Sequence, residues 1–316
     1  MKLAVWDPGE PFRRWRDALM QHAGEAGLAV EVVDATAEPD AQADFALVWK
    51  PPAEWLTGQL GLRAVFNLGA GVDAVLPLMH ACAPDVPLLR LEDAGMGRQM
   101  ADFVAESVLH AYRRMPEYAA QQARHQWAAL PLPPRGGFHV GFLGLGQMGL
   151  AAARRVAAMD FPVLACTRSG ARRSGADANW PLYPLERLDD FLAACRVLVV
   201  LLPLTRHTSG LLDWRALQLL PRGAYLVSAG RGAVIDEHDL LDLLADGHLA
   251  GATLDVFARE PLPPDDALWR HPRVRVTPHV AAPTLVGPAA AQVMRNIAAI
   301  ERGEPPAGRV DPTLGY

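Results

Sequence analysis

The sequence is poor in features that would place it in a specialised class of proteins. It has three cysteines, Cys82, Cys166 and Cys195, and no Cys-x-x-Cys pair. A small, uneven number of cysteines argues against a disulfide framework and indicates a protein of a reducing compartment. The longest apolar runs, such as residues 197–204, fall far short of the roughly 20 residues that a membrane-spanning helix needs.

A signal peptide and a strong charge are also lacking. Asp7, Pro8 and Glu10 stand where a signal peptide would need apolar residues. The formal net charge of the 316-residue chain is −5, without the basic domain that usually marks a nucleic-acid partner. Hydrophobic residues make up 51% of the chain, which is ordinary for a globular protein long enough for two domains. We expect a cytoplasmic protein with neither a nucleic-acid nor a membrane partner.

Two common catalytic motifs are missing as well. Neither the Gly-x-Ser-x-Gly turn of many hydrolases nor the His-Glu-x-x-His motif of zinc enzymes occurs. Internal repeats and low-complexity tracts are not evident. The sequence therefore predicts no metal site.

What the chain does contain is an alternation of β-rich runs and helical segments. The first series of runs is KLAVW, AVEVV, FALVW, RAVFNL and PLLRL, and the second is HVGFLG, PVLAC, RVLVVLL, AYLVSA, ATLDVF and VRVTP. Continuous apolar runs indicate strands buried on both faces, and their alternation with helices predicts βαβ units and parallel sheets. Between the series, residues 98–126 predict a long helix that is interrupted near Pro116.

We predict an α/β fold of two doubly wound, Rossmann-like domains with parallel sheets. The cofactor domain, residues 99–282, would be inserted in a flavodoxin-like substrate domain formed by residues 1–98 and 283–316. Short connections near residues 97 and 282 predict a hinge, with the substrate bound between the domains.

A glycine-rich turn follows the first strand of the second series. Gly144, Gly146 and Gly149 form a G-x-G-x-x-G pattern between a strand and a helix. The first glycine would permit a tight turn, the second would leave room for a pyrophosphate, and the third would let helix and strand pack closely. The helix N-terminus would favour the phosphate charge. We interpret the turn as a dinucleotide site; the alternative is a tight turn without a ligand.

The next strand ends without the acidic residue that often binds a ribose hydroxyl of NAD. Thr167, Arg168 and Ser169 stand there, followed by Arg172 and Arg173. An arginine at this place can accommodate a 2′-phosphate. We expect Arg168 to contact that phosphate, with the other two arginines adding positive potential. The prediction is a preference for NADPH over NADH; the alternative is a solvated basic loop.

Three polar residues, Arg231, Glu260 and His279, each stand just past a later strand. The carboxyl ends of parallel strands converge on a ligand crevice, so we expect these residues to meet. An arginine can hold a carboxylate and polarise a carbonyl, and a protonated histidine can donate a proton. A carboxylate beside a histidine favours the protonated form. The set suits hydride transfer to a 2-oxo acid, although each residue alone has an ordinary structural explanation.

Longer stretches resemble the D-isomer-specific 2-hydroxyacid dehydrogenases. GLGQMG, LLPLTRHTSGLL, LVSAGRGAVIDEHDLLDLL, GATLDVFAREPLP and HPRVRVTPHVAA occur in the order and spacing of that family. Four further stretches resemble one group within that family, the glyoxylate/hydroxypyruvate reductase A group. They are FALVWKPP, AVFNLGAGVDAVL, PLLRLEDAGMGRQMADFV and RVDPTLGY.

The resemblance implies roles for individual residues. Arg231, Glu260 and His279 would be catalytic, with His279 as the general acid/base and Glu260 as its partner. The implied cofactor-binding residues are Gly144, Gly146, Gln147, Met148, Gly149, Thr167, Arg168, Ser169, Leu202, Pro203, Thr208, Ala229, Gly230, Arg231, Asp255 and His279. The implied substrate-binding residues are Trp49, Leu68, Gly69, Ala70, Gly71, Arg231 and His279.

The resemblance also implies an activity and an assembly. The protein would reduce glyoxylate to glycolate and hydroxypyruvate to D-glycerate with NADPH. It would be a homodimer through its cofactor domain, with residues 98–127 as a swapped arm. Lys50 stands where this group is expected to have histidine, which would alter substrate preference. Two alternatives stay open: a dehydrogenase for another D-2-hydroxy acid, such as D-lactate, and a non-catalytic protein that senses NAD(P)H.

Overall fold

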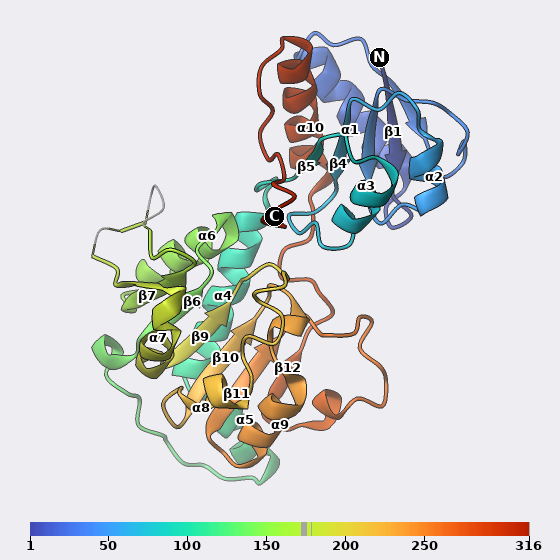
Figure 1. Ribbon diagram of the computed structural model, residues 1–316. Helices are drawn as coiled ribbons and strands as arrows, with labels where there is room; N and C mark the ends of the chain where they lie inside the picture. Colours follow the sequence, from blue (N-terminus) through green and yellow to red (C-terminus); the bar gives the residue numbers. More distant parts are fainter. Residues whose placement is uncertain (172–175, 178, 316) are drawn as a thin grey trace. The chain divides into compact units, whose positions relative to one another are not determined.

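The computed structural model describes residues 1–171, 176–177 and 179–315. Arg172 and Arg173, which were expected to add positive potential, lie outside the described residues. The chain forms two compact units: unit 1 is Met1–Gly95 with Thr284–Tyr316, and unit 2 is Met96–Pro283. Each unit has its own parallel sheet with helices on both faces (Figure 1), so the predicted fold class of two α/β domains is confirmed.

Unit 1 has a five-stranded sheet in the order β2-β1-β3-β4-β5, in which every neighbouring pair is parallel. Its strands are β1 Lys2–Trp6, β2 Glu31–Asp34, β3 Phe45–Val48, β4 Ala64–Asn67 and β5 Leu88–Arg90. Its helices are α1 Phe12–Glu25, α2 Ala53–Gly58, α3 Leu76–Cys82 and α10 Val286–Glu301. The helix α10, from the end of the chain, packs beside α1 (Figure 1). Apolar residues of α2 and α3 pack with those of β1, β3 and β4 in one buried cluster.

Unit 2 has a seven-stranded parallel sheet in the order β12-β11-β10-β9-β6-β7-β8. Its strands are β6 Val140–Leu143, β7 Val163–Thr167, β8 Leu182–Pro184, β9 Val197–Val200, β10 Ala224–Ser228, β11 Leu249–Leu254 and β12 Val274–Val276. Its α-helices are α4 Met96–Tyr112, α5 Met115–Ala123, α6 Gln147–Ala157, α7 Leu188–Ala194, α8 Trp214–Gln218 and α9 Glu237–Ala245. Its short 3-10 helices are η1 Arg135–Gly137, η2 Leu185–Arg187, η3 Gly232–Val234 and η4 Ala267–Arg270.

Both faces of the unit 2 sheet are buried. Alternate residues of the central strands pack with α7, α8 and α9 on one face, and the intervening residues pack with α4 and α6 on the other. This two-sided burial is the reason that the strands are continuous apolar runs. The strand order reverses between β6 and β9, which is the place where ligands bind in open α/β sheets.

Three local details differ from the sequence predictions. The interruption expected near Pro116 in the helix over residues 98–126 is present, and only its exact place differs: Arg114 adopts a left-handed backbone (φ 59°) between α4 and α5. Pro116 lies in the first turn of α5, where no backbone N–H is required. The strand expected over residues 252–257 is Leu249–Leu254, and β8 was not expected because it has only three half-buried residues and ends in proline.

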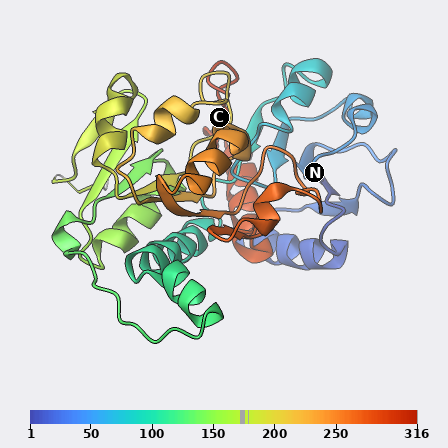
Figure 2. The same cartoon turned by 90° about the horizontal axis from the view of Figure 1, so that it is seen from below.

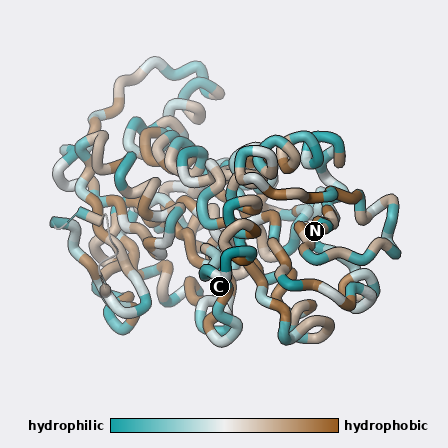
Figure 3. The backbone as a smooth tube through the Cα atoms, turned by 90° about the horizontal axis from the view of Figure 1, so that it is seen from above, coloured by the Kyte–Doolittle hydropathy of each residue, from teal (hydrophilic) through white to brown (hydrophobic). Residues whose placement is uncertain are grey.

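After α5, residues 124–134 run as an extended segment without regular structure and swing away from the helices of unit 2 (Figures 1 and 2). Hydrophobic and hydrophilic stretches alternate along the tube in Figure 3. Among the described residues, no helix combines the length and the apolar character that crossing a bilayer requires.

Candidate active site

The sequence-predicted residues of unit 2 lie at the carboxyl ends of its strands. Gly144 follows β6, Arg168 follows β7, Leu202 follows β9, Asp255 follows β11 and His279 follows β12. Because all seven strands are parallel, these turns share one edge of the sheet. Unit 2 therefore gathers its polar turns around the point where the strand order reverses.

The glycine turn has the geometry that a pyrophosphate requires. Gly144 has φ +100°, and a Cβ there would lie 2.9 Å from the Leu201 carbonyl oxygen. A Cβ at Gly149 would lie 2.2 Å from the Gly144 carbonyl oxygen, so helix and turn meet at backbone distance. A Cβ at Gly146 would meet nothing within 4 Å, which leaves open space beside the N-terminus of α6. No side chain in the described part of the chain caps that terminus, so its N–H groups can receive an anion. Gln147 and Met148 are the first residues of α6.

The end of β7 carries the residues expected to recognise the adenosine ribose. Arg168 and Ser169 are exposed. The Thr167 hydroxyl is buried and has no hydrogen-bond partner among the described residues, a rare state for a buried polar group. An exposed arginine beside an unpartnered buried hydroxyl suits a phosphorylated ribose. The residues present therefore fit a bound dinucleotide.

The remaining predicted cofactor contacts form two backbone turns at the same sheet edge. Leu202 and Pro203 follow β9, and the Thr208 hydroxyl folds this loop by donating to the Pro203 carbonyl oxygen over 2.7 Å. Ala229 is buried directly after β10. A Cβ at Gly230 would lie 2.6 Å from the Leu202 carbonyl oxygen. The two turns thus touch through their backbones, and this contact leaves no room for a side chain at Gly230.

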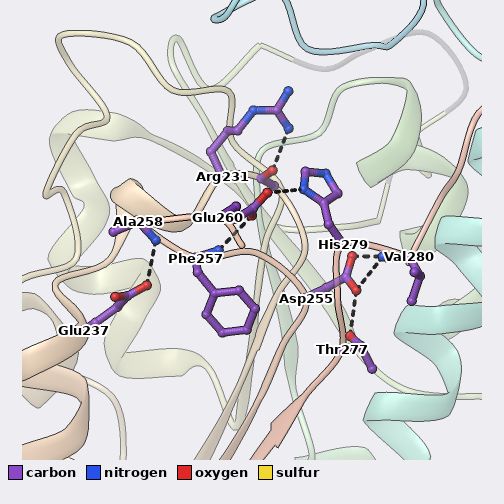
Figure 4. Close-up of polar contacts among 11 residues, drawn as sticks. Arg231, Glu237, Asp255, Phe257, Ala258, Glu260, Thr277, His279 and Val280 are labelled. Atoms are coloured by element: carbon purple, nitrogen blue, oxygen red, sulfur yellow. Dashed lines mark hydrogen bonds and ion pairs between the residues drawn. The ribbon is translucent and has the colours of Figure 1, made fainter. Parts of the chain in front are cut away.

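Glu260 and His279 form a hydrogen-bonded pair. Nδ1 of His279 lies 2.8 Å from Oε2 of Glu260, and Oε1 of Glu260 accepts the Phe257 amide over 3.0 Å (Figure 4). The side chains of His279 and Glu260 are 46% and 34% exposed, so the pair is open to a ligand. Because the carboxylate occupies Nδ1, Nε2 is the ring nitrogen left to act on a substrate.

The Asp255 carboxylate organises the segment that carries His279. It is 1% exposed and accepts the Thr277 hydroxyl over 2.6 Å and the Val280 and Ala281 amides over 2.9 and 2.8 Å. The Asp255 backbone oxygen accepts the His279 amide over 2.9 Å. Asp255 was expected among the cofactor contacts. In the structure its carboxylate accepts hydrogen bonds from three donors of the protein itself.

Arg231 lies on the same side of the site as the Glu260–His279 pair (Figure 4). It stands between β10 and η3, and its guanidinium donates to the Gly230 carbonyl oxygen over 2.9 Å. An arginine, a carboxylate and a histidine from three strand ends of one unit are thus brought together, as the sequence predicted.

The predicted substrate residues of unit 1 lie after β3 and β4. The Asn67 amide donates to the carbonyl oxygens of Gly69 and Gly71 over 3.0 and 2.9 Å, which curls the loop through Ala70. A Cβ at Gly69 would lie 3.0 Å from the Trp49 ring. Leu68 is buried under the loop. Lys50 has φ 47° and places Nζ 5.4 Å from the centre of the Trp49 ring.

Sequence reasoning missed one residue of the site. Glu237, the first residue of α9, accepts the Ala258 amide over 2.7 Å and so contacts the turn that carries Glu260 (Figure 4). A glutamate in a first helical turn is common and gives no specific signal.

Comparisons with known proteins agree with this geometry. A family model for the NAD-binding domain of D-isomer specific 2-hydroxyacid dehydrogenases matches residues 105–281. The chain is 38% identical to a D-isomer specific 2-hydroxyacid dehydrogenase from Xanthobacter autotrophicus Py2 in complex with NADPH and MES; the match covers 100% of this chain and 99% of that one, with a TM-score of 0.90.

Two further solved structures match with similar coverage. One is the NADPH-dependent glyoxylate/hydroxypyruvate reductase from Sinorhizobium meliloti in complex with NADP and sulfate, at 35% identity and a TM-score of 0.89 over 100% of this chain and 99% of that one. The other is a probable 2-hydroxyacid dehydrogenase from Rhizobium etli CFN 42 in complex with NADP, HEPES and L(+)-tartaric acid, at 31% identity and a TM-score of 0.86 over the same shares. The chain therefore belongs to the D-isomer specific 2-hydroxyacid dehydrogenase family, whose members are NAD(P)-dependent oxidoreductases.

Proposed function

We propose that the protein reduces short 2-oxo acids, glyoxylate to glycolate and hydroxypyruvate to D-glycerate. The observation that carries the proposal is the Glu260–His279 pair beside Arg231, at the edge of a sheet with a dinucleotide turn. The similarity to a glyoxylate/hydroxypyruvate reductase supports the substrate class.

The proposed mechanism assigns one task to each residue. When bound, NADPH supplies the hydride for the carbonyl carbon of the substrate. Arg231 holds the substrate carboxylate and polarises the carbonyl. His279 protonates the carbonyl oxygen through Nε2 while Glu260 holds Nδ1 and supports the imidazolium charge. Trp49, Leu68, Gly69, Ala70 and Gly71 remain proposed substrate contacts.

We further propose that NADPH is preferred over NADH. The support is the end of β7, where Arg168 stands beside the unpartnered Thr167 hydroxyl. Two of the similar structures hold NADP and one holds NADPH. A guanidinium suits a 2′-phosphate because it offers a planar set of donors to the phosphate oxygens.

A steady-state assay with glyoxylate and NADPH tests the catalytic roles. We expect His279→Ala to lower kcat roughly 100- to 10,000-fold, the contribution of general acid catalysis, with NADPH affinity retained. Turnover near the wild-type value would overturn the role of His279. A panel of longer 2-oxo acids and D-lactate in the same assay distinguishes the second candidate, a dehydrogenase for another D-2-hydroxy acid. Absence of turnover with every substrate would favour a protein that only senses NAD(P)H.

The same assay with both cofactors tests the preference. We expect Arg168→Ala to raise the KM for NADPH about tenfold or more, the effect of losing one charge-assisted contact, and to leave the KM for NADH nearly unchanged. Equal changes for the two cofactors would mean that Arg168 belongs to a solvated loop.

We also propose a homodimer formed through unit 2. The support is the segment 124–134, in which Trp127 is fully exposed and Leu132 is 44% exposed. Apolar side chains presented together on an extended segment are typical of a surface that a partner covers.

A further inference from the structure

Two carboxylates hold the turn over residues 257–260. The Phe257 amide donates to Glu260, and the next amide, of Ala258, donates to Oε1 of Glu237 over 2.7 Å (Figure 4). Glu260 is the partner of His279, whereas Glu237 comes from the start of α9. The turn that presents Glu260 is thus tied to a separate helix by one charge-assisted hydrogen bond.

The segment that leads to Glu237 also touches this turn. A Cβ at Gly232 would lie 2.0 Å from the Phe257 carbonyl carbon, so the two backbones are in direct contact. Gly232 directly follows Arg231, and Glu237 begins α9 a few residues later. Two contacts therefore hold the turn of Glu260 against the segment that carries Arg231. One is the backbone packing of Gly232 on Phe257, and the other is the hydrogen bond from the Ala258 amide to Glu237.

Glu237 is not needed to cap its own helix. The side chain of Asp236 accepts the His238 and Asp239 amides and serves as the N-cap of α9. Burial raises the pKa of Glu237, and the nearby carboxylates of Asp266, Asp236 and Glu260 raise it further, against the opposing effect of the Ala258 amide. These carboxylates come from the segment before η4, from the N-cap of α9 and from the turn that carries Glu260.

The direction of this shift bears on stability. A carboxyl group whose pKa is raised in the folded state binds its proton more tightly there than in the unfolded chain. Ionised Glu237 therefore lowers the free energy of unfolding at a pH above its folded pKa, and this cost decreases as the pH falls through that pKa and is gone below the pKa of the unfolded chain. A carboxylate that costs stability and holds an active-site turn is better explained by function than by folding.

We propose that Glu237 is a positioning residue for the reaction. Through the Ala258 amide it holds the 257–260 turn where Glu260 meets Nδ1 of His279. The proposal rests on the proposed function, because it assumes that the Glu260–His279 pair acts on the substrate.

Three variants test the proposal in the full-length protein. Glu237→Ala removes the acceptor for the Ala258 amide, and Glu237→Gln keeps a neutral acceptor of the same shape. The matched control is Asp239→Asn, because Asp239 also lies in the first turn of α9 and accepts a backbone amide from another segment, that of Trp214, over 2.7 Å. The control bond does not touch the turn of Glu260.

We expect Glu237→Ala to lower kcat about tenfold and Glu237→Gln about threefold at neutral pH, because a neutral acceptor binds an amide about half as strongly as a charged one. NADPH affinity should stay unchanged, and hydrogen exchange at the Ala258 amide should quicken in Glu237→Ala alone. The melting temperature of Glu237→Gln should equal or exceed that of the wild type, since the ionised carboxylate is gone. A purely structural residue would instead lose stability together with activity.

The pH dependence gives the sharpest readout. Protonated Glu237 and glutamine are both neutral acceptors, so the ratio of wild-type kcat to Glu237→Gln kcat should fall towards one as the pH falls through the raised pKa of Glu237. Titrations of groups that do not interact with Glu237 cancel in this ratio, whereas those of Asp266, Asp236 and Glu260, which act on Glu237, do not. The corresponding ratio for Asp239→Asn should stay constant.

A ratio that does not change with pH, or a normal kcat in Glu237→Ala, would overturn the proposal. Its failure is distinct from failure of the proposed function. If His279→Ala abolishes turnover and Glu237→Ala does not reduce it, only the positioning role is wrong. If His279→Ala turns over normally, the proposed function is wrong and the positioning role is wrong with it.

Discussion

At the scale of single residues, His279 has an uncommon backbone conformation. Its φ of 54° lies in the left-handed region, which few residues other than glycine adopt and which the surrounding structure must hold. Asp255 enforces it, because its backbone oxygen holds the His279 amide and its carboxylate holds the next two amides. The Asp255 carboxylate therefore folds the segment after β12, and this fold holds the His279 side chain in the site.

This arrangement predicts the effect of Asp255→Asn. The amide NH₂ of asparagine would face a donor that the carboxylate now accepts, and a buried unsatisfied group costs about 1–3 kcal/mol. We expect the free energy of unfolding to fall by about 2 kcal/mol, kcat to fall about tenfold or more, and NADPH affinity to stay unchanged. Chemical denaturation, steady-state kinetics and fluorescence titration measure the three quantities.

Thr277→Val is the control for that substitution. It removes one donor to Asp255 and leaves both backbone amides bound, so it should cost about 1 kcal/mol with kcat nearly intact. If Asp255→Asn weakened NADPH binding without loss of stability, the side chain would be a cofactor contact and the structural account of it would be wrong.

At the scale of elements, two glycines of the turn between β6 and α6 have different roles. One is needed for the fold, and the other leaves space for a ligand. Gly144 is required by the fold, because it has positive φ and a Cβ would collide with the Leu201 backbone. Gly146 is required only if something occupies the space beside it, because a Cβ there meets nothing and its φ of −66° suits any residue.

The pair Gly144→Ala and Gly146→Ala tests this distinction. Gly144→Ala should lower the free energy of unfolding by about 2–3 kcal/mol, through strain at positive φ and the collision. Gly146→Ala should change stability by less than about 0.5 kcal/mol and weaken NADPH binding about tenfold or more. Thermal unfolding in the absence of cofactor measures the stability of each variant, and a titration with NADPH measures its affinity for the cofactor. Unchanged NADPH affinity in Gly146→Ala would contradict a pyrophosphate at this turn.

The accuracy of the sequence predictions follows from how local each signal is. Strands such as β6 and β9 were predicted because both faces are buried and the runs are unbroken. The break before α5 was expected from Pro116, but its exact place depends on the backbone of Arg114; β8 was not expected, because its three residues form a strand by pairing with β7. Among the site residues, Arg231, Glu260 and His279 follow strand ends in recognisable turns. The contact of Glu237 with Ala258 could not be predicted, because it joins two residues 21 positions apart whose separation matches no known motif.

At the scale of the whole molecule, both units have a parallel sheet whose strand order reverses at one point. The two units differ in the residues that lie at that point. In unit 1 the strand order reverses between β1 and β3, and the turn after β1 carries Asp7. That carboxylate accepts the Trp15 ring N–H over 2.8 Å and the Gly9 amide over 2.9 Å, so it occupies the place where a phosphate would bind. In unit 2 the same place is a glycine turn before an uncapped helix. The winding is common to both units, and the family model of an NAD-binding domain matches residues 105–281, which lie in unit 2.

The assembly of whole chains yields the last prediction. If the exposed segment 124–134 covers a second copy, the protein should have twice the mass of one chain in light scattering after gel filtration. An aromatic anchor in an interface contributes about 2–4 kcal/mol, so Trp127→Ala should weaken the dimer roughly 30-fold or more. The control is Trp214→Ala, because Trp214 is another tryptophan of unit 2 that is half exposed; it should leave the mass unchanged. A wild-type protein that stays monomeric at high concentration would overturn the dimer. A Trp127→Ala variant that dimerises as tightly as the wild type would place the interface elsewhere on unit 2.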